Sequence, residues 1–436
     1  MFLKRLQLGL IHVAVAMTLL PINSTLNRVM INELALSAGL VGLLASLPYL
    51  FSPLQVAIGS FSDRNPIFGR RRSPYILLGL VLCTLGVVVA PQVAFLMADQ
   101  PGLGLLAAAL AFGAWGMGYN LATVSYFSLA TELSGEQARS RTIATMFIMM
   151  IVSIIFTSYG LSRLLDPYSP QVLQSAFWMV AAVALGLGLL GLLGLEPRHD
   201  GASSPASENY TLRQMTQTLA GNPQVRRFFI YLILLFVAIL GQDILLEPYA
   251  ANAFGLTVDQ TTRINTYWGT FFLISMALGA ALEKRVNKLT QARLGAWLGM
   301  LSFALIIISG LVISAGMFYG GVVLLGVATG FSTVSNLSLM LDMTAPGQIG
   351  LYIGAWGMAN AFARLCGNVL AGVGRDLGHF ITGNPAAGYM AVFSVELVLL
   401  AVSLYLLGRI DVGVFRHRNA DGMTALERAA LAGDAG

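Results

Sequence analysis

The chain contains twelve stretches of mostly apolar residues, and this pattern constrains its fold more than any other feature. A helix needs about 20 such residues to cross the apolar core of a bilayer. Only 10% of the 436 residues are charged, against about 25% in a soluble domain. The sequence therefore predicts an all-α integral membrane protein with twelve transmembrane helices. The expected spans are residues 8–30, 39–60, 75–97, 103–130, 142–164, 174–195, 227–252, 264–283, 293–315, 318–341, 350–372 and 388–408.

Lys and Arg residues are distributed unevenly between the loops. If the N-terminus is cytoplasmic, twenty of the 25 Lys and Arg residues fall in the N-terminus, the even-numbered loops and the C-terminal tail. Such residues are enriched in cytoplasmic loops, so both termini are expected to be cytoplasmic. The net charge of +5 does not indicate nucleic-acid binding, because the basic residues flank apolar segments instead of forming one patch. No small-residue cleavage site follows the first apolar run, so we expect a retained first helix.

A polar interruption with Ser and Pro residues separates six spans from the next six, and we expect it to be a linker with a short interfacial helix. The stretches "FSLATELS" (127–134) and "LSLMLDMT" (337–344) match at an offset of 210, which sets Glu132 against Asp342. Such similarity indicates duplicated halves. We predict an N-terminal six-helix half (1–195), a cytoplasmic linker (196–226), a C-terminal six-helix half (227–408) and a cytoplasmic tail (409–436).

The first and seventh spans both carry polar residues toward their outer ends. The stretches "NRVMIN" (27–32) and "QDILLE" (242–247) match at an offset of 215, which sets Arg28 against Asp243. Ionised groups within a bilayer are costly unless they are paired, and the i, i+4 spacing of Asp243 and Glu247 puts both acids on one helix face. We predict that Arg28 faces one of these acids across the halves. The alternative is that Arg28 extends to the outer headgroups and Glu247 lies in the interface. The predicted inter-half cluster is Asn27, Arg28, Glu33, Gln242, Asp243 and Glu247.

The loop after the second span, "GSFSDRNPIFGRRRSPY" (59–75), combines a glycine, an acid and a basic cluster. A positive-inside loop alone would explain the arginines. The glycine, acid and basic residues at this spacing resemble the signature loop of the major facilitator superfamily, in which such groups hold helix ends together in one conformational state. The corresponding stretch "GAALEKRVNK" (279–288) keeps Gly279, Glu283, Lys284 and Arg285. The predicted cytoplasmic latch is Gly59, Asp63, Arg64, Arg70, Arg71, Arg72 and Glu132.

Three motifs in this order, "LNRVMINEL", "SDRNPIFGRRRSPYILLG" and "GQDILLEPYA", resemble the PucC and LhaA family over about residues 4–410. This family is the bacteriochlorophyll delivery branch of the major facilitator superfamily, and the sequence suggests a cyanobacterial member or a close relative. The resemblance implies an assembly factor that loads chlorophyll or bacteriochlorophyll into light-harvesting proteins. It implies chlorophyll-binding apoproteins as partners and an inner, intracytoplasmic or thylakoid membrane as the location. It also implies functional roles for the residues at the family's motif positions, which are Asn27, Arg28, Glu33, Asp63, Arg70, Arg71, Gln242, Asp243 and Glu247.

One histidine and several polar side chains lie within the expected spans. His12 is a candidate ligand for a tetrapyrrole magnesium, and the alternative is a histidine that is hydrogen bonded within the bundle. Arg364 is expected to face the interior and to contact Asn336 or Asn360, because an intramembrane arginine is a functional candidate. Asn120, like Asn336 and Asn360, is either a magnesium ligand or a hydrogen-bonding contact between helices.

Two classes of function remain open from the sequence. The first is a pigment-handling assembly factor, and the second is a proton-coupled secondary transporter of a small solute. An enzyme is not expected, because no nucleophile with a base, no nucleotide loop and no metal cluster is evident. The glycine pattern "GLGLLG" (186–191) lies inside a span without a preceding strand, so it lacks the context for phosphate binding.

Overall fold

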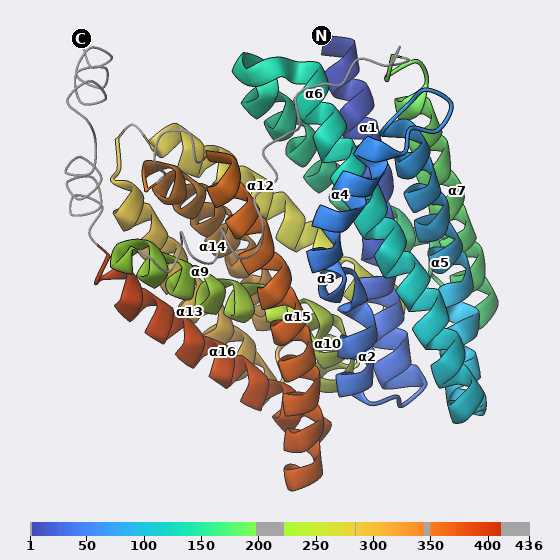
Figure 1. Cartoon of the computed structure of the whole chain (residues 1–436). Coiled ribbons are helices and arrows are strands. Elements are labelled where there is room, and N and C mark those ends of the chain that lie inside the picture. Colours follow the sequence, from blue (N-terminus) through green and yellow to red (C-terminus); the bar gives the residue numbers. More distant parts are fainter. Residues whose placement is uncertain (1, 198–221, 284, 344–348, 411–436) are drawn as a thin grey trace.

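Long apolar helices make up the fold. The computed structural model describes residues 2–197, 222–283, 285–343 and 349–410, and in them nine helical segments are long and apolar enough to cross a membrane. These are Leu3–Glu33, Ser73–Asp99, Pro101–Ser134, Arg141–Leu164, Pro170–Leu192, Pro223–Ile244, Lys288–Leu311, Ala315–Asp342 and Pro385–Leu407. Figure 1 shows the first half of the chain, from blue to green, beside the second half, from yellow-green to red.

The first half contains the following helices: α1 (Phe2–Pro21), the π-helical turns η1 (Ile22–Leu26) and η2 (Val29–Glu33), α2 (Ala38–Ala45), α3 (Leu47–Leu50), η3 (Ser52–Leu54), α4 (Gln55–Arg64), α5 (Ser73–Asp99), α6 (Pro101–Leu164) and α7 (Pro170–Leu192). The second half contains α9 (Pro223–Gly241), η4 (Gln242–Ile244), α10 (Leu246–Phe254), α11 (Val258–Thr262), α12 (Ile264–Leu282), α13 (Lys288–Leu311), α14 (Ala315–Asp342), α15 (Ile349–Thr382) and α16 (Pro385–Leu407).

The second expected span is broken, although the sequence predicts one continuous helix over 39–60. Four short helices, α2, α3, η3 and α4, replace it. Pro48 and Pro53 fall at the start of α3 and in η3, and a proline cannot donate the backbone hydrogen bond that continues an α-helix. Asn120 on α6 supplies a hydrogen bond at this break in the helix, because its Nδ2 donates to the carbonyl of Pro48 at 2.7 Å. The eighth and eleventh expected spans correspond to α12 and to part of α15.

The element α6 includes two spans and a reversal of direction between them. In a straight α-helix, residues eight apart lie about 12 Å apart along the axis. The Ser134 hydroxyl nevertheless donates to the Thr142 hydroxyl at 2.7 Å. The chain therefore turns back between these two residues, and Pro101–Ser134 and Arg141–Leu164 cross the membrane separately.

Several helices begin at a capping residue that the sequence supplies. The side chains of Ser169, Asn222, Asn287, Ser314 and Asn384 accept a hydrogen bond from a backbone N–H in the first turn of the helix that follows. Such caps satisfy one of the free donors at a helix N-terminus. Three of these helices also begin with proline, which has no N–H to leave unpaired at that position.

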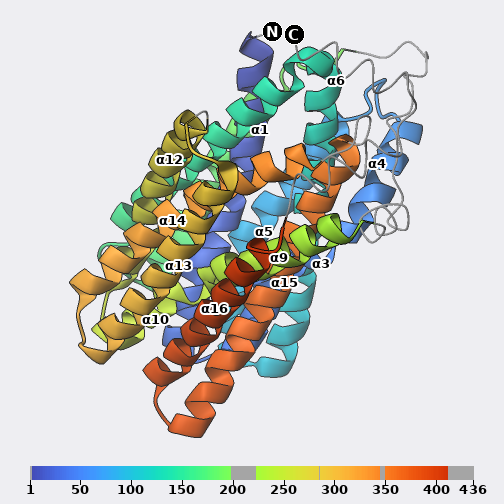
Figure 2. The same ribbon diagram turned by 90° about the vertical axis from the view of Figure 1, so that its left-hand side faces the viewer.

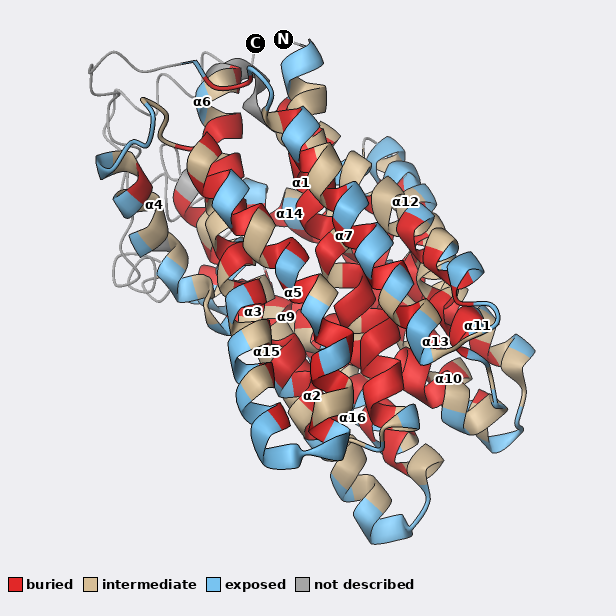
Figure 3. Ribbon diagram, turned by 90° about the vertical axis from the view of Figure 1, so that its right-hand side faces the viewer, coloured by how far each residue is buried: buried red, intermediate tan, exposed pale blue. Residues whose placement is uncertain are grey.

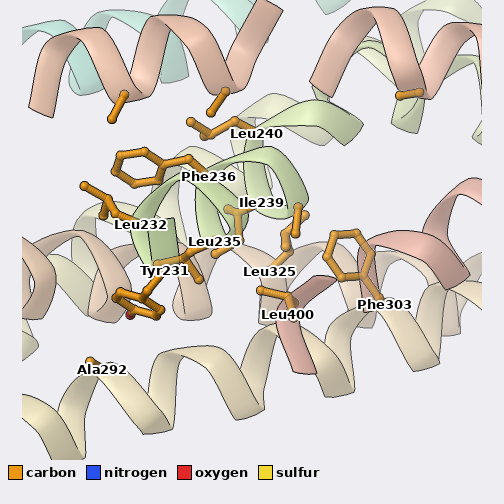
Figure 4. Close-up of a cluster of buried hydrophobic side chains, with 14 of the residues drawn as sticks. Tyr231, Leu232, Leu235, Phe236, Ile239, Leu240, Ala292, Phe303, Leu325 and Leu400 are labelled. Atoms are coloured by element: carbon orange, nitrogen blue, oxygen red, sulfur yellow. The ribbon is translucent and has the colours of Figure 1, made fainter. Parts of the chain in front are cut away.

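Each half packs around its own apolar residues. One cluster of the second half joins α9, α13, α14 and α16 through Leu235, Ile239, Phe303, Leu325 and Leu400, and Figure 4 shows these side chains facing one another. Two further clusters lie mainly in the first half, although Val258 of the second half belongs to one of them and Ala45 of the first half belongs to the cluster of the second. Figure 2 shows α12, α13 and α14 side by side, with α9, α15 and α16 next to them. Each half therefore packs mainly around its own residues.

The outer surface is apolar, as expected for a protein that bilayer lipid surrounds. Figure 3 shows buried residues on the inward faces of the helices and exposed residues on the outward faces. Outward side chains include Leu110 and Phe156, which are 68% and 70% exposed. The expected interfacial helix in the linker and most of the tail lie outside the described residues.

Candidate functional site

The polar stretch that ends the first span does not form a regular α-helix. After Pro21 the chain makes two π-helical turns, Ile22–Leu26 and Val29–Glu33. Such turns are rare and are often found at functional sites. The second turn brings Arg28 to Glu33, five residues later, with Nη1 and Oε1 at 2.5 Å. Arg28 is 5% exposed, and its Nη2 also donates to the carbonyl of Leu256 in the second half at 3.2 Å.

This pairing differs from the predicted inter-half ion pair. Arg28 is paired with Glu33 and not with Asp243 or Glu247. Two local departures from α-helical geometry are the reason. The π-helical hydrogen bond spans five residues and so brings Glu33 under Arg28. In the second half, Asp243 lies in the 3₁₀ turn η4 and Glu247 in the following helix α10, so the two acids do not share a face of one regular helix or a partner.

Glu247 lies between the halves and is 2% exposed. It accepts hydrogen bonds from the Ser24 hydroxyl of the first half and from Asn265 Nδ2 of α12, the latter at 2.8 Å. Its second oxygen has no hydrogen-bond partner among the described residues. The acid thus joins the halves through neutral donors instead of through Arg28.

Further hydrogen bonds join the halves on the same side of the membrane, which we call the far side because it lies opposite the N-terminus. The Asn32 amide donates to the carbonyl of Pro248 at 3.0 Å, and Asn252 donates to Asn32 at 2.8 Å. The bonded pairs that complete this far-side cluster are Thr25 with Thr262, Ser158 with Thr262 and Thr266, Ser162 with Arg263, and Ser24 with Asn265. Asn27 is fully buried, and its Nδ2 donates to the carbonyl of Asn23 at 2.8 Å.

Asp376 of α15 caps α2 across the halves. Its carboxylate accepts from the Ser37 hydroxyl at 2.7 Å and from the backbone N–H groups of Ala38 and Gly39 at 3.1 and 2.9 Å. A carboxylate at a helix N-terminus satisfies free donors and interacts favourably with the helix dipole. Gly372, one turn earlier, lies against the Ala38 backbone, where an added Cβ would meet the Ala38 carbonyl oxygen at 2.3 Å. The far side is therefore closed.

On the N-terminal side, Arg72 gathers two acids of the first half. Its Nη2 lies 2.5 Å from Asp63 Oδ1 and 2.8 Å from Glu132 Oε1, and its Nη1 donates to Ser62 at 2.8 Å. Arg72 is 4% exposed. The structure thus brings together three residues of the predicted latch and ties the ends of α4 and α5 to α6.

The other predicted latch residues take different places. The carboxylate of Glu196 accepts from the backbone N–H groups of Arg71, Arg72 and Ser73, and so it caps α5. Arg64 is exposed, and the buried Nε of Arg70 has no hydrogen-bond partner among the described residues. Gly59 faces α6, where an added Cβ would lie 3.4 Å from Val124 Cγ1.

The second half repeats this arrangement with a lysine. Lys288 Nζ lies 2.9 Å from Asp342 Oδ2 and 3.5 Å from Glu283 Oε1. Asp342 thus occupies the place of Glu132, as the offset of 210 predicts, and Glu283 the place of Asp63. Lys288, and not Arg285, is the basic partner, and Lys284 lies outside the described residues. Each triad connects helices of one half only.

Arg364 lies near the middle of α15 and contacts Asn360, one of its two expected partners, with Nε and Oδ1 at 3.2 Å. Its Nη1 forms an ion pair with Asp243 at 3.0 Å. The guanidinium also lies over the ring of Tyr49 of the first half, 5.7 Å from its centroid. Gln242 is buried and donates to Asp243 at 3.0 Å. Asp243 therefore belongs to a pair within the second half.

Asn336 and Asn120 make contacts between helices, whereas the contact of Asn360 with Arg364 lies within α15. Asn336 accepts from the Tyr231 hydroxyl at 2.8 Å and so links α14 to α9. Asn120 accepts from Gln55 at 2.7 Å in addition to donating to Pro48.

His12 is 5% exposed and lies among the aromatic rings of Tyr126, Phe127 and Phe147, with centroids 5.1 to 5.5 Å away. Its Nδ1 is buried and has no hydrogen-bond partner among the described residues. At this nitrogen the structure shows no hydrogen bond of the kind that the expected alternative requires.

Several residues of the cluster were not identified from the sequence. Ser24 and Asn265 are ordinary polar residues until the fold places them around Glu247. Asp376 and Lys288 lie near helix ends, where charged residues are common. Glu396 had a stronger signal, because "FSVELVLL" puts an acid in the middle of an apolar span.

Comparisons with known proteins agree on family and fold. The family model described as "PUCC protein" matches residues 25–415. Protein PucC of Cereibacter sphaeroides is 30% identical over 418 residues, which cover 92% of this chain and 90% of the relative. The bacteriochlorophyll synthase 44.5 kDa chain of Rhodobacter capsulatus is 29% identical, with 92% and 94% covered.

A solved structure shows the fold alone. A mutant of the nucleoside transporter NupG superposes with a TM-score of 0.74 at 14% identity, over 93% of this chain and 99% of the transporter. The fold is therefore that of the major facilitator superfamily, as predicted.

Proposed function

The chain belongs to the PUCC protein family, and from this premise we propose that it is a membrane assembly factor that delivers chlorophyll or bacteriochlorophyll to light-harvesting or other chlorophyll-binding proteins. The names of its relatives support this proposal, since one is a Protein PucC and another is called a bacteriochlorophyll synthase chain. The transporter-like fold supports a role within the membrane but does not identify a substrate.

His12 is the observation that carries the proposal to this chain's own residues. A buried ring nitrogen without a hydrogen bond, such as Nδ1 of His12, is unfavourable, because it loses its contact with water and gains none in return. If a chlorin is bound there, a ring nitrogen of His12 would hold its magnesium. The aromatic rings around His12 would stack against a flat, apolar macrocycle. His12 therefore fits such a cargo chemically.

A lateral groove begins at Val13, the residue after His12, although His12 itself does not line it. It has a volume of about 400 Å³ and is lined by Val13 and Met17 of α1, Leu187 of α7, and Met149, Val152, Ser153, Phe156 and Thr157 of α6. Phe147 packs edge-on against His12 and is itself 41% exposed, so its ring extends from the histidine to the surface. An apolar pigment would enter such a groove sideways from the lipid.

We also propose that the N-terminal side is the cytoplasmic side of an inner, intracytoplasmic or thylakoid membrane. The distribution of Lys and Arg supports this orientation. The far side, where the halves are joined, would then face away from the cytoplasm.

The experiment is to purify the protein from a pigment-producing host in a mild detergent and to record its absorption spectrum and protein composition. We expect a chlorin spectrum and a chlorophyll-binding apoprotein in the complex. The variant His12→Leu should lose most of the pigment, whereas His379→Leu, which alters a histidine at the far end of α15, should retain it.

Equal pigment content in both variants would exclude His12 as the ligand. Absence of pigment and partner from the wild-type protein, together with saturable uptake of a soluble solute into proteoliposomes, would favour the proton-coupled transporter instead.

A further inference from the structure

One buried acid takes no part in the contacts described above. Glu396 lies at the midpoint of α16, eleven residues from each of its ends, Pro385 and Leu407. A helix rises about 1.5 Å per residue, so the carboxyl group is roughly 16 Å from either end and near the centre of a bilayer core about 30 Å thick.

The surroundings of Glu396 offer it no partner. The side chain is 3% exposed, and neither carboxyl oxygen has a hydrogen-bond partner among the described residues. Its neighbours one turn away on α16, Val392 and Leu400, belong to the apolar cluster of the second half. Other acids of the described second half, such as Asp243, Glu247, Asp342 and Asp376, all have partners.

The charged groups on the neighbouring elements do not neutralise it. Helix α16 packs against α9, α10, α13 and α15. Beyond the end of α9, Asp243 is an acid and is itself paired with Arg364. Arg364 of α15 is bound to Asp243 and Asn360. On α10, Glu247 is bound to Ser24 and Asn265, and the Tyr249 hydroxyl donates to the carbonyl of Ile306. Between Arg293 and its end, α13 carries no ionisable residue.

An ionised carboxylate without a partner is strongly disfavoured at such depth, whereas a neutral carboxylic acid is tolerated far better. We propose that Glu396 is a proton-binding site, and that it holds its proton while the far side is closed. The ligand is a proton from water, which converts the carboxylate to the carboxylic acid.

The Asp243–Arg364 pair provides the connection between this site and the movement of the halves. The side chains of Arg364 and Asp243 are 25% and 32% exposed, so they reach space that Glu396 does not. Arg364 also contacts Tyr49 of the first half. Helix α15, which carries Arg364, packs directly against α16, which carries Glu396. A rearrangement of the halves that moves Arg364 would therefore also change the surroundings of Glu396, and in this way proton binding is coupled to the conformational state.

Infrared spectroscopy of the full chain in lipid nanodiscs tests this site directly. A protonated carboxyl group has a C=O band that is distinct from the bands of a carboxylate. We expect the wild-type protein to show this band at neutral pH and Glu396→Gln to lose it. Glu396→Asp, which keeps an acid at the same place, should shift the band, and the control Glu283→Gln, which removes a half-buried paired acid, should leave it unchanged.

A band that persists unchanged in both Glu396 variants would overturn the proposal. The coupling has its own readout, the pH dependence of the distance between spin labels on the two halves. We expect this dependence to be lost in Glu396→Gln, which resembles the protonated state at every pH. An identical pH profile in the wild type and in Glu396→Gln would show that the acid is not coupled to the halves.

Discussion

The far-side cluster and the two triads of the N-terminal side contain similar residues but connect different parts of the molecule. On the far side, Glu247 and Asp376 of the second half bind Ser24, Ser37 and the start of α2 in the first half. On the N-terminal side, Arg72 and Lys288 each bind two acids of their own half. Within the described ranges, the hydrogen bonds between the halves lie on the far side.

This difference indicates how the molecule can move. The triads strengthen each half as a unit, and the far-side cluster holds the two units together at one end. Opening of the far side requires that the inter-half bonds break while each half keeps its internal structure. Such movement of two bundles around a central site is the usual mechanism of this fold. The following predictions test the comparison, from the largest expected effect to the smallest.

Replacement of Arg72 by Ala should have the largest effect on stability. The change leaves the carboxylates of Asp63 and Glu132 close together without their shared cation. We expect the free energy of unfolding to fall by about 2–3 kcal/mol, because the two negative charges are then no longer compensated. Lys288→Ala is the matched variant in the second half. The Lys288 side chain is 28% exposed, so the free energy of unfolding should fall by only about 1 kcal/mol. Thermal unfolding in detergent measures the stability of both variants. Equal losses of stability would contradict the explanation that Arg72 contributes more because it is more deeply buried than Lys288.

Asp376→Ala should open the far side without weakening either half. Loss of this cap should destabilise the state with the far side closed by about 1–2 kcal/mol. This corresponds to a five- to thirtyfold shift of the equilibrium toward the state with the far side open. Distances between spin labels at Gln100 and Ile313, in a background without Cys83 and Cys366, report on the far side. Asp342→Ala, which alters a contact within the second half, should leave those distances unchanged. Equal changes in these distances in both variants would contradict the claim that only the far-side cluster holds the halves together.

A double-mutant cycle distinguishes the observed partner of Arg28 from the predicted one. Truncation of Arg28 and Glu33 to Ala, singly and together, should give a coupling energy of about 1 kcal/mol because one partner is buried and the other is half exposed. The corresponding cycle for Arg28 and Asp243 should give a coupling near zero. A larger coupling with Asp243 would restore the predicted inter-half clamp.

The smallest effect is expected for Asp63→Asn in the first triad. Asp63 is 34% exposed, and Glu132 remains bound to Arg72, so the free energy of unfolding should fall by only about 0.5 kcal/mol, with normal insertion. Because this triad lies within one half, cysteine labelling on both sides of the membrane should give the same accessibility as in the wild type. A clear change in accessibility would show that the triad takes part in switching.

Periodicity and length were sufficient to predict an all-helical membrane fold, because the bilayer requires long apolar segments wherever the chain crosses it. They did not predict the break in the second expected span, where Pro48 and Pro53 interrupt the helix. The repeat offset also predicted that Asp342 corresponds to Glu132. The partners of Arg28 could not be predicted in this way. The i, i+4 rule assumes a regular α-helix, but the chain forms π-helical turns before Glu33 and a 3₁₀ turn at Asp243. Such departures depend on the packing of the halves and not on local sequence alone.

The lysine of the second triad was missed for a related reason. Three basic residues follow Glu283 within five positions, and the sequence does not show which one turns toward Asp342. Only the start of α13 at Lys288 decides this. Glu396, in contrast, could have been identified from its position in an apolar span.

Deletion of the gene in its host tests the central claim, the delivery of pigment, most directly. The quantities to measure are the amount of assembled chlorophyll-binding antenna and the rate of pigment synthesis. A protein within the bilayer would protect an apolar, photoreactive pigment during transfer. Loss of this protein should therefore lower the amount of assembled antenna while pigment synthesis continues. Restoration by the wild-type gene, but not by one that carries His12→Leu, would connect the phenotype to the proposed pigment ligand. Normal antenna levels in the deletion strain would contradict the account.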